Sequence, residues 1–193
     1  MACRYFVAVK PSKNIRISIN QILPNILSEN DLDKLRLVRI ENLHLTLFFL
    51  GHRSDDNLNM DKKIIKRISS DVAPFDLQLD RIEPFPHSRY SRGLWISGKH
   101  HNMFTKLNDM LSLYADSNNS NILKKKAFAH CTIARFKHYV NKLERLKIST
   151  KITTNPIRIF LKFRVDSICL FKTRFTKNVL FYELLEEYLL QNV

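Results

Sequence analysis

Hydrophobic residues along this chain repeat with two different periods. Five short segments are rich in β-branched and aromatic residues or alternate apolar with polar positions, which is typical of strands with one buried face. These predicted strands are residues 4–9, 43–50, 75–79, 94–97 and 128–136. Residues 157–190 have the same character and are predicted to form mainly three further strands.

Other segments place their apolar residues at helical spacing. Pro11 and Ser12 offer a helix start, and the isoleucine and leucine residues from Ile15 to Ile26 then line one helix face. Pro24 is expected to kink or shorten this helix, because proline cannot donate the backbone hydrogen bond. Further helices are predicted at residues 55–71, 103–114 and 142–147.

The order of these elements predicts an α+β fold with antiparallel sheets. A strand, a helix and a strand carrying the tripeptide His-x-Thr come first, and related elements lead to a second His-x-Thr. We therefore expect two pseudo-symmetric lobes, each an antiparallel sheet flanked by helices, with an active-site cleft between them. No linker interrupts the chain, so residues 1–193 are predicted to be a single domain, with a surface loop at 116–121.

The chain is strongly basic, with a net charge of +14 and a pI of about 9.9. This imbalance indicates a polyanionic partner, either a nucleic acid or an anionic membrane face. The densest basic patch is residues 124–126, followed by Arg135, Lys137 and His138. Solvated basic faces of a lysine-rich chain are the alternative explanation.

Several classes of protein are disfavoured by the sequence. No apolar run approaches the roughly 20 residues that cross a bilayer, and the N-terminus lacks a secretory signal, so a cytosolic protein without membrane contact is expected. The three cysteines, Cys3, Cys131 and Cys169, form no CxxC pair. We expect them to be buried hydrophobic residues, and neither a disulfide framework nor a thiolate zinc site is predicted.

The two His-x-Thr tripeptides carry the candidate chemistry. They are His44-Leu45-Thr46 and His130-Cys131-Thr132, each within a predicted strand. Because strand side chains alternate, each motif presents one imidazole and one hydroxyl on the same face. A neutral imidazole can accept a proton from a nucleophile while a protonated one donates to a leaving oxygen, and the two threonines can bond to phosphate oxygens.

The two histidines could also have a structural or a metal-binding role. A single histidine on a strand is more often structural than catalytic, but two copies of the motif reverse that expectation. Zinc would need at least three protein ligands, whereas His44 and His130 supply two and have no neighbouring carboxylate. No metal and no other cofactor is therefore predicted.

The two motifs resemble the signatures of the 2H phosphoesterase superfamily, and within it the LigT-like RNA 2′,3′-cyclic phosphodiesterases, also called 2′-5′ RNA ligases. The resemblance rests on residues 43–51 and 130–136, and is extended by residues 4–9, 93–96 and 170–174. Two positions depart from the family pattern. Ala129 precedes the second histidine where proline is usual, and Thr173 stands where serine is usual.

The resemblance implies metal- and ATP-independent hydrolysis of 2′,3′-cyclic phosphate ends, on RNA, tRNA fragments or nucleotide-sized substrates, to 2′-phosphomonoesters. It also implies 2′-5′ ligation in the reverse direction by a monomeric enzyme. In the implied pose, His44 protonates O3′ and His130 activates water. Arg135 would assist at the phosphate, although simple alternation places it on the strand face opposite His130.

Three further residues are candidates for substrate contacts. Phe171 and Tyr90 are candidates for stacking on a base, with core burial as the alternative for Phe171, and Arg174 could contact phosphate or base. Trp95 is expected in the core. The remaining histidines have no threonine partner and are expected at the surface; they are His52, His87, His100, His101 and His138.

Two alternative functions remain open at this point. One is a 2′,5′-oligoadenylate phosphodiesterase that uses the same four motif residues with a different base pocket. The other is a non-catalytic RNA-binding protein on the same scaffold, against which the intact histidine and threonine pairs argue.

Overall fold

The computed structural model describes residues 4–99, 101–117, 128–154, 156, 158–176 and 179–191. The strands are β1 (Tyr5–Val9), β2 (Leu35–Leu37), β3 (Leu45–Gly51), β4 (Phe75–Phe85), β5 (Gly93–Ser97), β6 (His130–Phe136), β7 (Arg158–Val165), β8 (Ser167–Thr176) and β9 (Val179–Leu189). The helices are α1 (Lys13–Ile26), α2 (Glu29–Asp33), α3 (Asp55–Ser70), α4 (Asn102–Ser117) and α5 (Lys142–Thr154), with 3-10 turns η1 (Ile40–Asn42) and η2 (Ser88–Tyr90).

The strands form one antiparallel sheet with two halves. One half has the order β7-β4-β5-β6 and the other β3-β1-β8-β9, while β2 adds to β6. The halves meet where Leu45 of β3 pairs with Cys131 of β6. The predicted α+β class with antiparallel sheets flanked by helices is confirmed, and the two expected lobes correspond to the two halves of a continuous sheet that does not close into a barrel.

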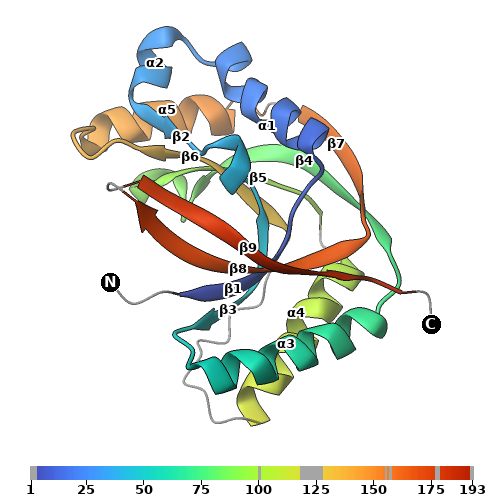
Figure 1. Ribbon diagram of the computed structural model, residues 1–193. Helices are drawn as coiled ribbons and strands as arrows, with labels where there is room; N and C mark the ends of the chain where they lie inside the picture. Colours follow the sequence, from blue (N-terminus) through green and yellow to red (C-terminus); the bar gives the residue numbers. More distant parts are fainter. Residues whose placement is uncertain are drawn as a thin grey trace.

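Helices cover the sheet in two groups (Figure 1). One group, α3 and α4, packs on strands of the β3-β1-β8-β9 half, while α5 packs on β4 and η2, and α1 and α2 lie on the same side as α5. The longer helices bury apolar residues in a single large core, as with Ile19 and Leu23 of α1 and Phe104 of α4, whereas α2 has no buried residue. No helix within the described ranges is long and apolar enough to span a membrane.

Most predicted elements are found, with changes at their ends. Helix α1 begins after Ser12, whose hydroxyl caps Ile15, and it continues through Pro24 to Ile26. Strand β4 and helix α5 are longer than predicted, and α2 and β2 were not predicted at all, because segments of five and three residues carry little periodicity. Residues 116–117 extend α4 instead of opening the predicted loop, and the rest of that loop lies outside the described residues.

Candidate active site

The two motifs lie side by side where the halves of the sheet meet. Leu45 and Cys131 are paired antiparallel and are fully buried, so both point into the core. Continuing this register places His44 across from Thr132 and His130 across from Thr46. Two imidazoles and two hydroxyls therefore share one face of the sheet within two adjacent strands.

The imidazole of His44 is held by backbone and side-chain partners. Its Nδ1 lies 2.7 Å from the carbonyl oxygen of Asn42, and its Nε2 lies 3.1 Å from Oγ1 of Thr46. Because a carbonyl can only accept, Nδ1 carries a proton and Nε2 is the nitrogen available for proton transfer. The rings of Phe6 and Tyr182 contact the imidazole, each with a centroid separation of 4.9 Å, and the Tyr182 ring is nearly perpendicular to it.

His130 has a matching environment on the other half of the sheet. Its Nδ1 lies 2.9 Å from the carbonyl oxygen of Phe128, which again leaves Nε2 for chemistry. Trp95 lies 4.5 Å and Phe128 4.7 Å from the ring, measured between centroids. Each imidazole thus donates to the carbonyl two residues before it and packs against aromatic rings.

Burial makes both imidazoles weaker bases than usual. Desolvation lowers the pKa of His44 to about 4, helped by the nearby His130 and opposed by the hydrogen bond to Asn42. Desolvation also lowers the pKa of His130, opposed by its bond to Phe128. Both rings are therefore neutral near pH 7 in the free protein. An anion bound between them would raise both pKa values.

A β-bulge follows each motif and re-aims the residues beyond it. On β6, Trp95 pairs with Thr132 and Leu94 with Ala134, so Ile133 is the extra residue. The bulge returns Arg135 to the face of His130 and Thr132, where simple alternation would have turned it away. The corresponding shift on β3 makes Leu47 the extra residue. It brings Phe49 to the face of His44, in the place that Arg135 takes in the second motif.

The Arg135 side chain lies in a basic part of this face. It is exposed, with its guanidinium carbon 5.3 Å from the centre of the Phe85 ring. Its strand neighbours are Gly93 on β5 and Arg36 on β2, which faces it directly. Like charges opposite each other are unfavourable, and within the described chain no carboxylate forms an ion pair with either arginine. The positions of Arg36 and Arg135 on neighbouring strands therefore favour binding of an anionic ligand between the two guanidinium groups.

The other predicted contacts are placed further out or are already engaged. Phe171 is 2% exposed and stacks on Phe6, so the buried alternative holds for its ring. Arg174 forms an ion pair with Glu183 at 2.6 Å. Tyr90 is exposed on η2, with Lys142 5.1 Å from its ring centre, and no described contact joins it to either histidine.

Two expectations for aromatic residues were wrong. Trp95 is half-buried against His130 instead of lying in the core, and its indole Nε1 has no hydrogen-bond partner among the described residues. His101 is not a surface residue, because it stacks on Phe75 at 4.8 Å and its Nδ1 is buried.

Three histidines and two cysteines lie where the sequence predicted them. His52, His87 and His138 are exposed, and Cys131 and Cys169 are buried free thiols. Cys3, His100 and the basic patch at 124–126 lie outside the described residues. No cluster of three or more metal-ligating side chains occurs in the part of the chain that is described.

Three residues near the histidines were missed by the sequence analysis. Asn42 and Tyr182 contact His44 from segments without a motif, and Phe49 is 64% exposed beside Phe6, 6.1 Å away. The aromatic character of residues 48–49 was visible, but its direction depended on the bulge. Tyr182 could not have been placed beside His44 without the pairing of the strands.

Two adjacent antiparallel strands each present a histidine and a threonine on one face, which is the arrangement expected of a 2H phosphoesterase. Comparisons with known proteins agree with this class. The family model described as LigT like Phosphoesterase matches residues 9–95. The chain is 29% identical over 189 residues to the RNA 2′,3′-cyclic phosphodiesterase of Methanocaldococcus jannaschii, which covers 96% of this chain and 99% of that protein.

A second relative and a solved structure extend the likeness. The RNA 2′,3′-cyclic phosphodiesterase of Archaeoglobus fulgidus is 31% identical over 135 residues, covering 69% of this chain and 73% of that protein. Escherichia coli LigT, solved in complex with 3′-AMP, superposes with a TM-score of 0.76 over 100% of both chains at 22% identity. The chain belongs to the LigT-like family of 2H phosphoesterases, and it is a phosphoric diester hydrolase.

Proposed function

We propose that this protein hydrolyses 2′,3′-cyclic phosphate ends of RNA to 2′-phosphomonoesters, with His44 and His130 as the acid and base. The observation that carries the proposal is the pairing of Leu45 with Cys131, which brings both imidazoles and both threonine hydroxyls to one face. The basic chain and the names of the relatives support RNA as the substrate. Residues 1–193 act as a single domain in this proposal, since one core runs through both halves.

The proposed reaction uses the free Nε2 of each ring. His130 takes a proton from water while the water oxygen bonds to phosphorus in line with O3′. The bond from phosphorus to O3′ breaks, and His44 gives its Nε2 proton to O3′. The products are a 2′-phosphate and a 3′-hydroxyl, and the two rings recover their starting states by exchanging one proton with solvent. With a 5′-hydroxyl in place of water, the same displacement would break the bond from phosphorus to O3′ and join the two ends through a 2′-5′ bond, with the 5′-hydroxyl proton passing to His130.

The low pKa of His44 makes this acid dependent on its substrate. With a pKa of about 4 in the free protein, His44 is uncharged near neutral pH. The negative charge of the bound phosphodiester raises the pKa of His44, so this imidazole is protonated only when substrate is bound. Thr46 bonds to Nε2 of His44 in the free protein and must turn toward a phosphate oxygen on binding. Thr132 and Arg135, both on β6, bind the same phosphate.

Single substitutions test the proposed roles. His44→Ala and His130→Ala are each expected to lower turnover of a cyclic nucleotide by roughly 10² to 10⁴-fold, and Thr46→Val and Thr132→Val by less. His138→Ala is the matched control, since that ring is exposed. A near-normal rate in either active-site histidine variant, with circular dichroism showing a folded protein, contradicts the mechanism.

The identity of the product and of the acid needs two further measurements. Phosphorus NMR should show a 2′-phosphate, and a predominant 3′-phosphate would reverse the pose. In a cyclic analogue with sulfur in the 3′ bridging position, the leaving group is a thiolate, which needs no protonation. This analogue should therefore restore the activity of His44→Ala but not that of His130→Ala. Activity confined to 2′,5′-oligoadenylate, or RNA binding without turnover, would favour one of the two alternative functions instead.

A further inference from the structure

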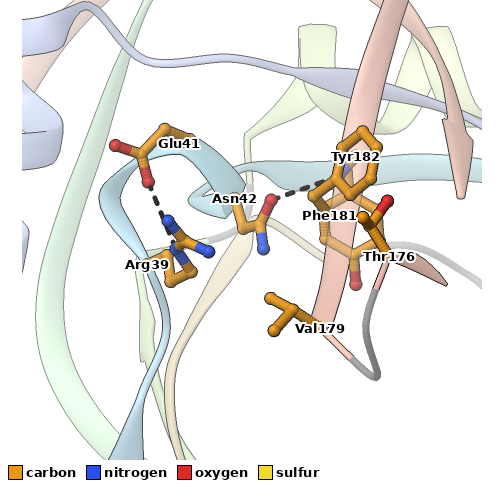
Figure 2. A pocket seen from close by; sticks show the side chains of 7 residues that line it. All are labelled: Arg39, Glu41, Asn42, Thr176, Val179, Phe181 and Tyr182. Atoms are coloured by element: carbon orange, nitrogen blue, oxygen red, sulfur yellow. Dashed lines mark hydrogen bonds and ion pairs between the residues drawn. The ribbon is translucent and has the colours of Figure 1, made fainter. Parts of the chain in front are cut away.

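A pocket lies beside His44 but is lined by neither of the two histidines. It has a volume of about 440 Å³ and lies between η1 and the end of the β8–β9 hairpin at which β8 stops and β9 starts (Figure 2). Its lining residues are Arg39, Glu41, Asn42, Thr176, Val179, Phe181 and Tyr182. The two sides come from segments far apart in the sequence, and Figure 2 shows η1 and β9 on opposite sides of the pocket, joined by the hydrogen bond between Asn42 and Tyr182.

Two of the lining residues connect this pocket to His44. The carbonyl oxygen of Asn42 accepts from His44 Nδ1, while its side-chain amide donates to Leu180 and accepts from the backbone N–H of Tyr182. The Tyr182 ring lies nearly perpendicular to the His44 ring, with centroids 4.9 Å apart. A ligand in the pocket would therefore lie one side chain away from the first histidine.

The walls of the pocket combine flat apolar surface with charge at the rim. Phe181 is 36% exposed and Val179 is 43% exposed, so both offer apolar area to a ligand. The guanidinium of Arg39 pairs with Glu41 at 3.8 Å, and both side chains are mostly in solvent. Exposed pairs of this kind are weak, so Arg39 can turn to a phosphate at little cost. An aromatic wall with a nearby guanidinium is the chemistry that binds a nucleotide of single-stranded RNA.

We propose that this pocket binds the base of the penultimate nucleotide of the substrate, with Arg39 on the connecting phosphate. The proposal rests on the proposed function, because it takes the cyclic phosphate to lie between His44 and His130. A 2′,3′-cyclic phosphate ends the strand, so any further nucleotide must extend from its 5′ side. The pocket beside His44 offers that nucleotide a stacking surface and a positive charge. The enzyme is thereby specific for RNA ends over free cyclic mononucleotides.

Comparing two substrates on matched variants tests the pocket. The substrates are a cyclic mononucleotide and the dinucleotide that carries the same cyclic end. Stacking of one base contributes a factor of roughly 5 to 150 in affinity, so the wild type should show kcat/KM about tenfold or more higher on the dinucleotide. Phe181→Ala and Arg39→Ala should remove most of this preference and leave the mononucleotide rate unchanged, while Phe181→Trp should keep it. Phe160→Ala, which removes a 72% exposed aromatic on β7, is the control.

The possible outcomes separate this proposal from the proposed function. Equal wild-type rates on the two substrates, or equal losses on both in Phe181→Ala, would overturn the pocket assignment and leave the two-histidine reaction standing. If the wild type turns over neither substrate, the proposed reaction fails. Calorimetric affinities for the mono- and dinucleotide 2′-phosphates then decide the pocket separately, because the same variants should reduce only dinucleotide affinity. Thermal unfolding checks that each variant is folded.

Discussion

The buried imidazole of His44 should make the stability of the fold depend on pH. The pKa of this ring is about 4 in the folded protein and 6.5 in the unfolded chain. Between these values the unfolded chain binds a proton that the folded protein does not, so stability is complete above pH 6.5 and falls as the pH is lowered toward 4. For one such group the loss from pH 7.5 to 4.5 is about 2.5 kcal/mol. Screening of a half-buried ring reduces it to about 2 kcal/mol.

Urea denaturation of the wild type and of His44→Ala at both pH values measures this contribution. The variant should lose about 2 kcal/mol less stability than the wild type, because every other titrating group is common to both proteins. His138→Ala should lose as much as the wild type. If His44→Ala and the wild type lost the same stability, the low pKa of His44 and the anion-dependent loading of the acid would both be refuted. Saturation with a nucleoside 2′-phosphate should raise the pKa of His44, as followed by NMR.

Four other outcomes are expected. Turnover should survive EDTA, and a loss restored by one divalent metal would contradict this. RNA affinity should fall linearly with salt on logarithmic axes, so a flat response in filter binding would remove RNA as the reason for the basic charge. Gly93→Ala should lower activity and melting temperature together, since a Cβ there would lie 2.2 Å from the carbonyl oxygen of Ala134, beside Arg135. Arg53→Ala should cost about 3 kcal/mol in urea denaturation, because it leaves Asp61, 2% exposed, without its ion-pair partner; an unchanged midpoint would contradict this.

The sequence predicts the geometry of the two His-x-Thr motifs better than it predicts their neighbours. His and Thr at alternate positions of a strand must share a face, so each motif could be oriented from local geometry alone. Alternation failed for Arg135 because the bulge at Ile133 adds one residue to β6. The bulge depends on how β5 and β6 pair, and the sequence has no glycine or proline at Ile133 that would indicate a bulge. Phe49 was missed for the same reason, through the bulge at Leu47.

The long-range contacts around the site could not be predicted from the sequence pattern. Asn42 and Tyr182 meet because η1 packs against β9, and the hydrogen bond between them joins segments from opposite ends of the chain. Neither segment has a periodicity that indicates its partner. The burial of Phe171 could be anticipated only as one of two alternatives, because an apolar strand residue next to a cleft suits either a core or a ligand. In the folded protein Phe171 is buried, and Phe6 stacks on its ring.

The match of Leu45 with Cys131 gives the site an approximate two-fold rotation axis that passes between these two residues. A phosphodiester has the same symmetry at phosphorus, since a half-turn exchanges its two non-bridging oxygens and its two ester oxygens. In the trigonal bipyramid of an in-line displacement, the half-turn exchanges the entering and the leaving oxygen. Under the proposed chemistry, equivalent groups therefore face the bond that forms and the bond that breaks. The orientation of the ribose between the two halves must then be determined by the residues that break this symmetry. These residues are Phe49 on one strand and Arg135 on the other.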